Sequence, residues 1–400
     1  MIVALCTGAS VLECIDYKNI TNIHLCNDFT EDDDYNADIA INTVFEKLHK
    51  FVDLEELHFS EMTLNDKNFK CISSLNIDRL TFNCCIFDIR RAINFPKNVN
   101  DLELDNNEII RKRVTFNWHS LTGLEKLYIF DHSEKPAINR SDIHKIMLLT
   151  TIKNIRTANI EIDNELFINI CNNLINLEEL CLADDNFTKI PCEISKLTKL
   201  KSLIISGAPL ISLPKEIGDM LNLTRLIIDI QYYGEDTIFG LPLNIMNLNL
   251  IELRIDANFE INIPNEYAAL KHIETFSCDN NERNMLRWGT NVIVFLYDAD
   301  TKIDNGVTRV CIESVERQNL DNFPMSLEEL VINELRIPLT NLPPGLKKLT
   351  LIEYYDPLEL TRTKFPEIPK KELSDMPEIK LPFGCELVIK NIPYTMTMTM

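Results

Sequence analysis

Histidine and cysteine are the residues of this chain with the widest range of chemistry, and the sequence contains 7 histidines and 12 cysteines. A zinc site or a Cys–His nucleophile needs several such side chains at short spacing, or brought together in a cleft. The sequence has no CxxC and no two histidines three or four residues apart, and its nearest approaches are His24–Leu25–Cys26 and Cys84–Cys85. For both we favour outward strand positions or core filling, and we expect no metal site.

Glycine-rich phosphate loops are the second kind of chemistry to test. The chain has only 10 glycines, and none of them forms GxGxxG or GxxxxGK. A phosphate-binding loop needs these glycines so that its backbone can approach the ligand closely. The basic triplet Arg111–Lys112–Arg113 is a candidate targeting patch, but its neighbour Glu108 favours an ordinary loop. We therefore expect no cofactor.

The charge balance indicates the kind of partner. With 61 acidic against 40 basic residues, the formal net charge is −21, and such a protein is repelled by nucleic acid and by anionic membrane surfaces. The natural partner is a protein with a basic patch. No apolar run approaches the roughly 18–20 residues of a membrane span. The acidic stretch 28–38 predicts a solvated loop, with contact to a basic partner as the alternative.

The elements that must position any binding residue follow from a repeat, which is clearest over residues 177–264. Four copies read LEELCLADDNFTKIP, LKSLIISGAPLISLP, LTRLIIDIQYY…LP and LIELRIDANFEINIP. Apolar residues stand at the first, fourth and sixth positions, as at Leu177, Leu180 and Leu182. This spacing predicts a short strand with one buried face. One such strand can bury its face only against the next copy, so the pattern predicts an array.

The array extends in both directions from these copies. The copies start 20 to 28 residues apart, at Leu54, Ile77, Val99, Leu124, Ile152, Leu177, Leu200, Leu223, Leu250 and Leu270. Segments such as CEISKLTK and KEIGDMLN have apolar residues three apart, which predicts a turn or two of helix between strands. Residues 281–306 are hard to read as repeats. We predict an N-terminal cap with a first irregular repeat over 1–50, a solenoid over 51–355, and a C-terminal cap with a Pro-rich tail over 356–400.

These copies resemble the intracellular leucine-rich repeat proteins over residues 20–355. The 23-residue period and the elements PCEI and PKEI over 177–223 look most like the Ras-binding and phosphatase-regulator class. FPMSLEEL and LPPGLKKL over 320–354 are similar to the shorter repeats of bacterial effector ligases. The resemblance implies an α/β solenoid, a curved array with a parallel β-sheet on its concave face and short helices or loops on its convex face. It implies binding but no particular partner, because such repeats serve unrelated partners.

The ninth position of a regular repeat is usually asparagine, whose amide can satisfy buried backbone where the chain leaves the strand. Asparagine stands there at Asn107 and Asn258, the alternative cysteine at Cys85 and Cys278, and other residues at Asp185, Ala208 and Gln231. We therefore expect this ladder of hydrogen bonds to be interrupted in the middle of the array.

The cysteines indicate a compartment. They are scattered from Cys6 to Cys385, without the dense terminal clusters that cap extracellular leucine-rich repeats. This distribution favours reduced thiols and a cytoplasmic location. The apolar N-terminus MIVALCTGASVLECI lacks the basic residues that precede a secretory signal.

We expect a non-catalytic, monomeric scaffold that binds a protein on the concave face. The alternative is a substrate-recognition subunit for a ubiquitin ligase or a similar enzyme acting in trans. Exposed strand positions predict a contact row with isoleucines at its centre and a second, acidic row that would steer a basic partner. The first row is Tyr128, Arg156, Cys181, Ile204, Ile227 and Arg254, and the second is Asp131, Asp184, Asp229 and Asp256. The competing explanation is that exposed strands tolerate β-branched residues and that acidic residues keep the protein soluble.

Overall fold

The computed structural model describes residues 2–6, 17–26, 44–111, 114–132, 137–230, 239–257, 261–262, 275–279, 285–288, 291–297, 301–303, 305–315, 320, 323–355 and 377–393. The description is limited to the backbone for residues 2–6, 256–257, 261–262, 275–279, 285–288, 291–296, 313–314, 353–355 and 391–393. The chain divides into two compact units, Met1–Leu210 with Pro214–Leu223 and Ile211–Leu213 with Thr224–Met400. The boundaries predicted after residues 50 and 355 stay predictions.

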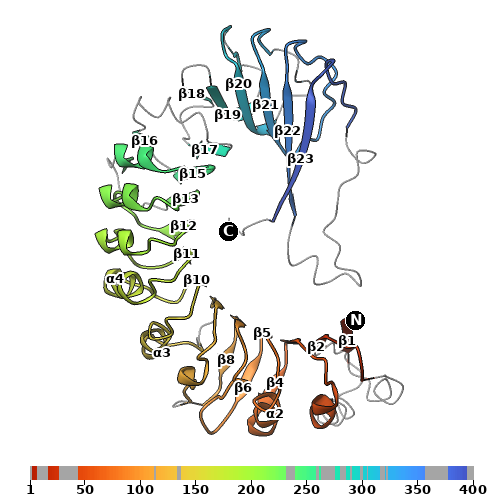
Figure 1. The fold of residues 1–400 in the computed structure, drawn as a ribbon, viewed down its shortest axis with the longest axis vertical. Coiled ribbons are helices and arrows are strands. Elements are labelled where there is room, and N and C mark those ends of the chain that lie inside the picture. The colour runs from red at the N-terminus through yellow and green to blue at the C-terminus, as the bar shows by residue number, and fades with distance from the viewer. Residues whose placement is uncertain are drawn as a thin grey trace. The chain divides into compact units, whose positions relative to one another are not determined.

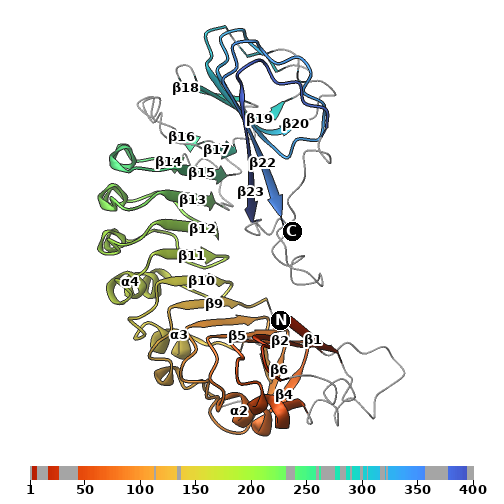
Figure 2. The same ribbon diagram turned by 45° about the vertical axis from the view of Figure 1, so that its right-hand side comes forward.

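The first unit is built around a parallel sheet to which each repeat contributes one strand (Figures 1 and 2). Its strands follow chain order: β1 (Ile2–Cys6), β2 (Asn22–Cys26), β3 (Glu56–Ser60), β5 (Arg79–Asn83), β7 (Asp101–Asp105), β9 (Lys126–Phe130), β10 (Asn154–Ala158), β11 (Glu179–Ala183) and β12 (Ser202–Ala208). Equivalent positions pair, so Leu57 lies beside Leu80 and Leu80 beside Leu102. The leucine-rich repeat predicted from the sequence is therefore confirmed.

Burial alternates along each strand as the repeat predicts. In β11, Leu180 and Leu182 at the fourth and sixth positions are fully buried, and the residues between and beside them are half-buried. Aromatic side chains fill the same sixth position near the N-terminus, where the rings of Phe59 and Phe82 stack with centroids 5.2 Å apart. Burying each large apolar side chain stabilises by about 1.5–3 kcal/mol. Each strand therefore depends on its neighbours for its core.

Helical segments lie on one side of this sheet (Figure 1). They are η2 (Leu48–Lys50), α2 (Asp66–Ile72), η3 (Trp118–Ser120), α3 (Arg140–Ile146), α4 (Asn164–Asn173), η4 (Cys192–Lys196) and η5 (Lys215–Asp219). Asn65, Asn139 and Asp163 cap the three α-helices by accepting hydrogen bonds from first-turn amides. Pro191 and Pro214 directly precede η4 and η5, where short helices were predicted. Three short strands, β4 (Thr63–Asn65), β6 (Ile86–Asp88) and β8 (Glu108–Ile109), form a separate small sheet.

The second unit has two groups of strands. The first group is β13 (Arg225–Ile230), β15 (Glu252–Ala257) and β17 (Thr275–Asp279), with η6 (Leu243–Asn247) and the short pair β14 (Phe239–Gly240) and β16 (Ile261–Asn262). The second group is a six-stranded sheet of β18 (Met285–Trp288), β19 (Asn291–Tyr297), β20 (Arg309–Val315), β21 (Glu329–Asn333), β22 (Lys348–Tyr355) and β23 (Glu386–Pro393). Its strands are parallel except for β18 and β19, whose antiparallel pairing lies in the stretch that is hard to read as repeats. Val310, Leu330 and Leu349 pack in its core.

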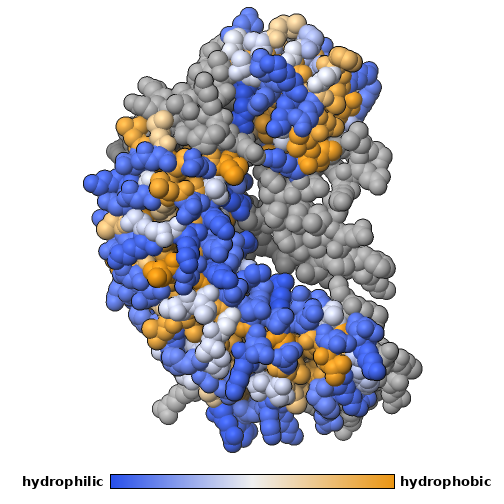
Figure 3. Space-filling view, viewed as in Figure 1, coloured by the Kyte–Doolittle hydropathy of each residue, from blue (hydrophilic) through white to orange (hydrophobic). Residues whose placement is uncertain are grey.

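Hydrophilic residues dominate the described surface of the first unit in the view of Figure 3. Figure 3 shows mainly hydrophilic residues over the first unit, with apolar residues scattered among them. In the described part of the chain, no helix is both long enough and apolar enough to cross a membrane.

Candidate binding surface

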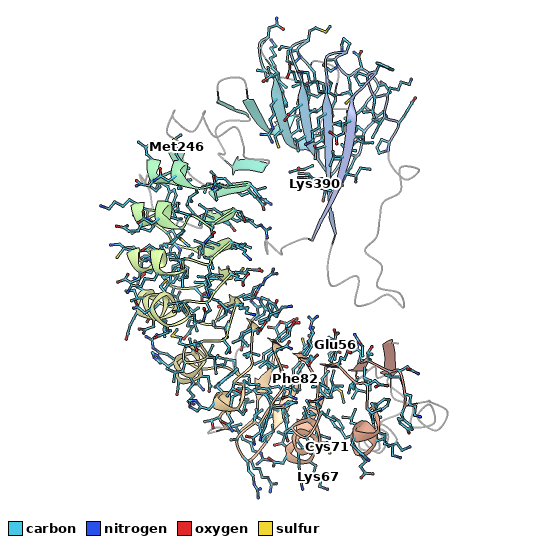
Figure 4. All side chains as sticks on the ribbon, in the orientation of Figure 1. Glu56, Lys67, Cys71, Phe82, Met246 and Lys390 are labelled. Atoms are coloured by element: carbon cyan, nitrogen blue, oxygen red, sulfur yellow. The ribbon has the colours of Figure 1, made fainter. Side chains whose placement is uncertain are left out.

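The sheet of the first unit packs its helices against one face only, and we call the other face the open face. The third, fifth and seventh positions of each repeat form the open face, because the fourth and sixth point into the core. In Figure 4, Glu56 of β3 lies on the open face, Phe82 of β5 in the core, and Lys67 and Cys71 of α2 beyond the core. Since the strands pair in register, equivalent positions form rows with about 4.8 Å between strands.

The predicted contact row lies at the fifth positions. In the first unit, the register places Tyr128 beside Arg156, Arg156 beside Cys181, and Cys181 beside Ile204. Tyr128, Arg156 and Cys181 are half-buried, so parts of these side chains reach solvent. The repeat thus brings together residues that are more than 20 positions apart in the sequence.

Two members of the predicted row are not exposed. Ile204 in the first unit and Ile227 in the second are each only 5% exposed, so the prediction that they form an accessible apolar centre is wrong. A β-branched side chain is short, and side chains on neighbouring strands lie within contact distance of it. Cys181 flanks Ile204, and the longer Arg254, itself half-buried, flanks Ile227. Replacing either isoleucine by Asp would bury a charge and lower stability.

Arg156 is held by neighbours on both sides of the row. Its guanidinium lies over the ring of Tyr128, 5.7 Å from the centroid, and its Nε donates to Oε1 of Glu179 at 2.6 Å. Glu179 also accepts from Nδ2 of Asn154 at 3.0 Å. Burial lowers the pKa of the Arg156 guanidinium. The attraction of the Glu179 carboxylate is stronger than this effect, so the pKa is raised overall. The open face therefore binds one guanidinium between an aromatic ring and a carboxylate.

Acidic side chains occupy every open-face position of β7, namely Asp101, Glu103 and Asp105. Arg79 of β5 donates to Glu103 at 3.1 Å. Asp101 lies 3.9 Å from Nε of Arg79 and 3.7 Å from Nζ of Lys126. Burial, followed by the charge of Glu103, raises the pKa of Asp105 to about 6. Two of the three carboxylates thus have basic neighbours on adjacent strands.

The four aspartates predicted as a second row do not share one. Asp131 and Asp184 follow the ends of β9 and β11, whereas Asp229 lies within β13 and pairs in register with Asp256 of β15. Asp131 is only 3% exposed and its Oδ2 accepts from the amide of Ala137 at 3.2 Å. The prediction that Asp131 is exposed is wrong, because its carboxylate is buried against the backbone amide of Ala137. Asp184 is exposed, and the side chain of Asp256 lies outside the described residues.

Two histidines that lie far apart in the sequence lie side by side on the open face. His24 and His58 are register partners, and their ring centroids are 6.2 Å apart. Nε2 of His24 is 2.8 Å from Oγ of Ser60, and Nε2 of His58 is 3.4 Å from Oε2 of Glu56. Burial, and then the charge of His58, lowers the pKa of His24. The signal that could have found this pair is that both residues hold the fifth position of adjacent copies.

The structure shows no candidate metal site among the residues that it describes. In that part of the chain, no three His, Cys, Asp or Glu side chains lie close enough together to hold an ion. Of the predicted basic triplet, Arg111 donates from Nε to Oδ1 of Asp88 at 2.6 Å. Lys112, Arg113 and the acidic stretch 28–38 lie outside the described residues.

The ladder of hydrogen bonds made by ninth-position side chains continues at a repeat that has another residue in place of asparagine. Oδ1 of Asn107 accepts from the amide of Cys85 at 2.9 Å, and its Nδ2 donates to the carbonyl of Phe82 at 2.9 Å. Asp185 accepts from the amide of Ile162 at 3.0 Å, so the expected interruption at this position is wrong. Burial raises the pKa of Asp185 to about 7. The side chains of three further ladder positions lie outside the described residues: Gln231, Asn258 and Cys278.

Comparison with known proteins returns structural likeness only. No protein-family model and no curated protein matches the sequence. A leucine-rich repeat protein of Leptospira interrogans is similar over 91% of this chain and 90% of its own, with 19% identity and a TM-score of 0.47. The plant peptide hormone receptor RGFR1 in complex with RGF2 matches with 16% identity and a TM-score of 0.39, over 98% of this chain and 62% of the receptor. The TLR13–ssRNA13 complex matches with 16% identity and a TM-score of 0.46, over 90% of this chain and 57% of that one.

Proposed function

We propose that this chain is a non-catalytic scaffold that binds a protein partner on the open face of its leucine-rich repeats. The observation that carries the proposal is the register of the strands from β2 to β12, which places side chains of different chemistry on one continuous face. Each repeat adds contact positions about 4.8 Å further along, so an extended partner can be recognised strand by strand. The net charge of −21 supports a basic protein over a nucleic acid as the partner.

The chemistry of the open face supports binding over catalysis. A side-chain nucleophile needs an adjacent base and a third group that orients the base. His24 and Ser60 come within 2.8 Å, but the ring beside His24 is that of His58. A second imidazole in this place disfavours the imidazolium that a general base must form, in agreement with the lowered pKa of His24.

Photo-crosslinking at defined positions tests the proposed function. A tagged chain would carry the crosslinking amino acid in place of Tyr128 on the open face or, as a matched control, in place of Asp219 at the end of η5. After irradiation in the native cell, we expect discrete protein adducts from position 128 and none of the same mass from position 219. Absence of adducts from position 128, or identical adducts from both positions, would remove the assignment. Ubiquitin-ligase subunits among the adducts would favour the alternative role as a recognition subunit.

We also propose that the chain acts as a monomer in the cytoplasm. The cysteines that form no disulfide in the described part of the chain support a reducing compartment: they include Cys71, Cys84, Cys85, Cys171, Cys192 and Cys385. Cell fractionation of the tagged chain and light scattering of the purified protein test the two parts. Recovery from a secretory compartment would contradict the first, and a mass of two chains would contradict the second.

A further inference from the structure

Asp105 and Phe130 form a carboxylate–aromatic pair on the open face of the first unit. They are register partners at the seventh positions of β7 and β9, and both are half-buried. The pair resembles the surroundings of Arg156, which lies over Tyr128 and donates to Glu179. Among the ion pairs of the described residues, none includes Asp105. The open face thus repeats the chemistry of a guanidinium site at a position where the described chain supplies no guanidinium.

Two buried oxygens beside Glu103 also need donors. Thr81 of β5 and Asp101 of β7 are each 8% exposed and stand at open-face positions. Within the described residues, neither Oγ1 of Thr81 nor Oδ1 of Asp101 has a hydrogen-bond partner. Thr81 pairs in register with Glu103, which follows Asp101 on the same face of β7. Nε of Arg79 is likewise buried and unpartnered within the described residues, 3.9 Å from Oδ2 of Asp101. These atoms are buried out of reach of another molecule, so a partner can use only the half-buried seventh positions of this region.

The charges around β7 leave one carboxylate without an ion pair among the described residues. Arg79 pairs with Glu103 at 3.1 Å, and Lys126 lies 3.7 Å from Asp101. The amide Nδ2 of Asn106 donates to Oδ1 of Asp105 at 2.9 Å but brings no charge, and His132 acts on Asp105 only as a nearby basic group. A cation in direct contact is therefore the ligand that would balance Asp105.

The aromatic neighbour of Asp105 favours arginine over lysine. A guanidinium carries five N–H donors and no acceptor, and its plane stacks on aromatic rings, whereas an ammonium is a compact and strongly hydrated charge. Phe130 supplies the ring at the register position next to Asp105. Arg156, which uses Tyr128 in the neighbouring row, shows that this face accommodates the geometry.

The next two seventh positions are small. Ala158 of β10 pairs in register with Phe130, and Ala183 of β11 pairs with Ala158. Ala158 is nevertheless only 6% exposed, whereas Ala183 is half-buried. The surface that a partner can reach beside Asp105 is therefore the ring of Phe130.

We propose that the open face over β7 and β9 binds an arginine of the partner protein, with its guanidinium on Asp105 and Phe130. This inference rests on the proposed function for the use of the open face, and it adds the chemistry of the segment that is recognised.

Selection from a random dodecapeptide library on the full chain tests the arginine site. We expect the wild-type chain to enrich peptides that contain arginine, and Asp105→Asn to weaken the binding of those peptides about tenfold or more. Phe130→Ala is expected to weaken them as well, with a reduced preference for arginine over lysine. Asp219→Asn removes an exposed acidic residue from η5 and should bind like the wild type. Thermal unfolding followed by circular dichroism checks that each variant is folded.

The other possible results decide whether the arginine site alone fails or the proposed function fails with it. Three results would overturn the arginine site. They are arginine enrichment that persists in Asp105→Asn, equal enrichment of lysine by the wild type, and a failure of the wild type to select any peptide. If peptides without arginine are selected and compete with the adducts formed at position 128, the arginine site fails and the proposed function stands. If the crosslinking experiment also yields nothing at position 128, both fail.

Discussion

The carboxylate of Asp185 accepts a hydrogen bond from the amide of Ile162 in the preceding repeat, with 3.0 Å between Oδ1 and N. Asn107 makes the matching bond to Cys85 and, in addition, donates from Nδ2 to the carbonyl of Phe82. Asp185 is only 2% exposed, and its Oδ2 has no partner within the described residues. The array thus holds a buried carboxyl group where an amide would satisfy one more backbone atom.

We expect Asp185→Asn to raise the free energy of unfolding by about 1–3 kcal/mol at pH 8. Burial raises the pKa of Asp185 to about 7 in the folded chain, above its value of about 3.9 when unfolded. Because the folded pKa is the higher one, this group stabilises the wild type at low pH, and that stability is lost as the pH rises through 7. Urea unfolding should therefore show a larger advantage for the variant at pH 8 than at pH 5.

The reciprocal substitution, Asn107→Asp, is the matched control for this experiment. It removes the donor to Phe82 and should lower the free energy of unfolding, more at pH 8 than at pH 5. An equal gain from Asp185→Asn at both pH values would show that titration of Asp185 does not contribute.

Thr157→Val is expected to raise the free energy of unfolding by about 1 kcal/mol. Thr157 holds the sixth position of its repeat, between Ile129 and Leu182 in the adjacent strands. It is 1% exposed, and its Oγ1 has no partner in the described part of the chain. Valine keeps the shape and removes the buried hydroxyl. Thr151→Val is the control in the same urea titration, and it should lower stability because Oγ1 of Thr151 donates to a carbonyl at 2.6 Å.

Leu203→Ala should cost about 2–5 kcal/mol of stability. Leu203 is fully buried and pairs in register with Leu180. In a repeat array the damage should be greatest in adjoining repeats. Hydrogen exchange should therefore show loss of amide protection in β11 and β12 before β2 and β3. Loss of protection in β2 and β3 alone would contradict this account of the core.

The sequence was sufficient to predict the core but not the open face. Leu180 and Leu203 lie side by side because a fixed period brings equal positions together. The cover over Ile204 depends on how far its neighbours reach, and no spacing encodes that reach. Asp131 is buried just past the end of β9 at Phe130, where the alternation of the strand no longer determines which way a side chain points.

The surroundings of Asp105 also determine how its binding should respond to pH. Burial and Glu103 raise its pKa to about 6, His132 lowers it, and Asp131 raises it further. On the adjacent strands its register partners are Asn83 and Phe130, which do not titrate. His132 is therefore the one basic group in this set.

Binding of an arginine peptide selected on the wild type should weaken about tenfold between pH 8 and pH 5, because a carboxyl group with a pKa of about 6 is about nine-tenths protonated at pH 5. A bound guanidinium favours the carboxylate, so loss of that charge lowers affinity. Fluorescence anisotropy of the labelled peptide at pH 8, 7, 6 and 5 measures the effect. His132 is the basic neighbour of Asp105, so His132→Gln is the control and should retain most of the decrease. Asp105→Asn should flatten the profile, and an unchanged slope in that variant would assign the pH dependence to another group.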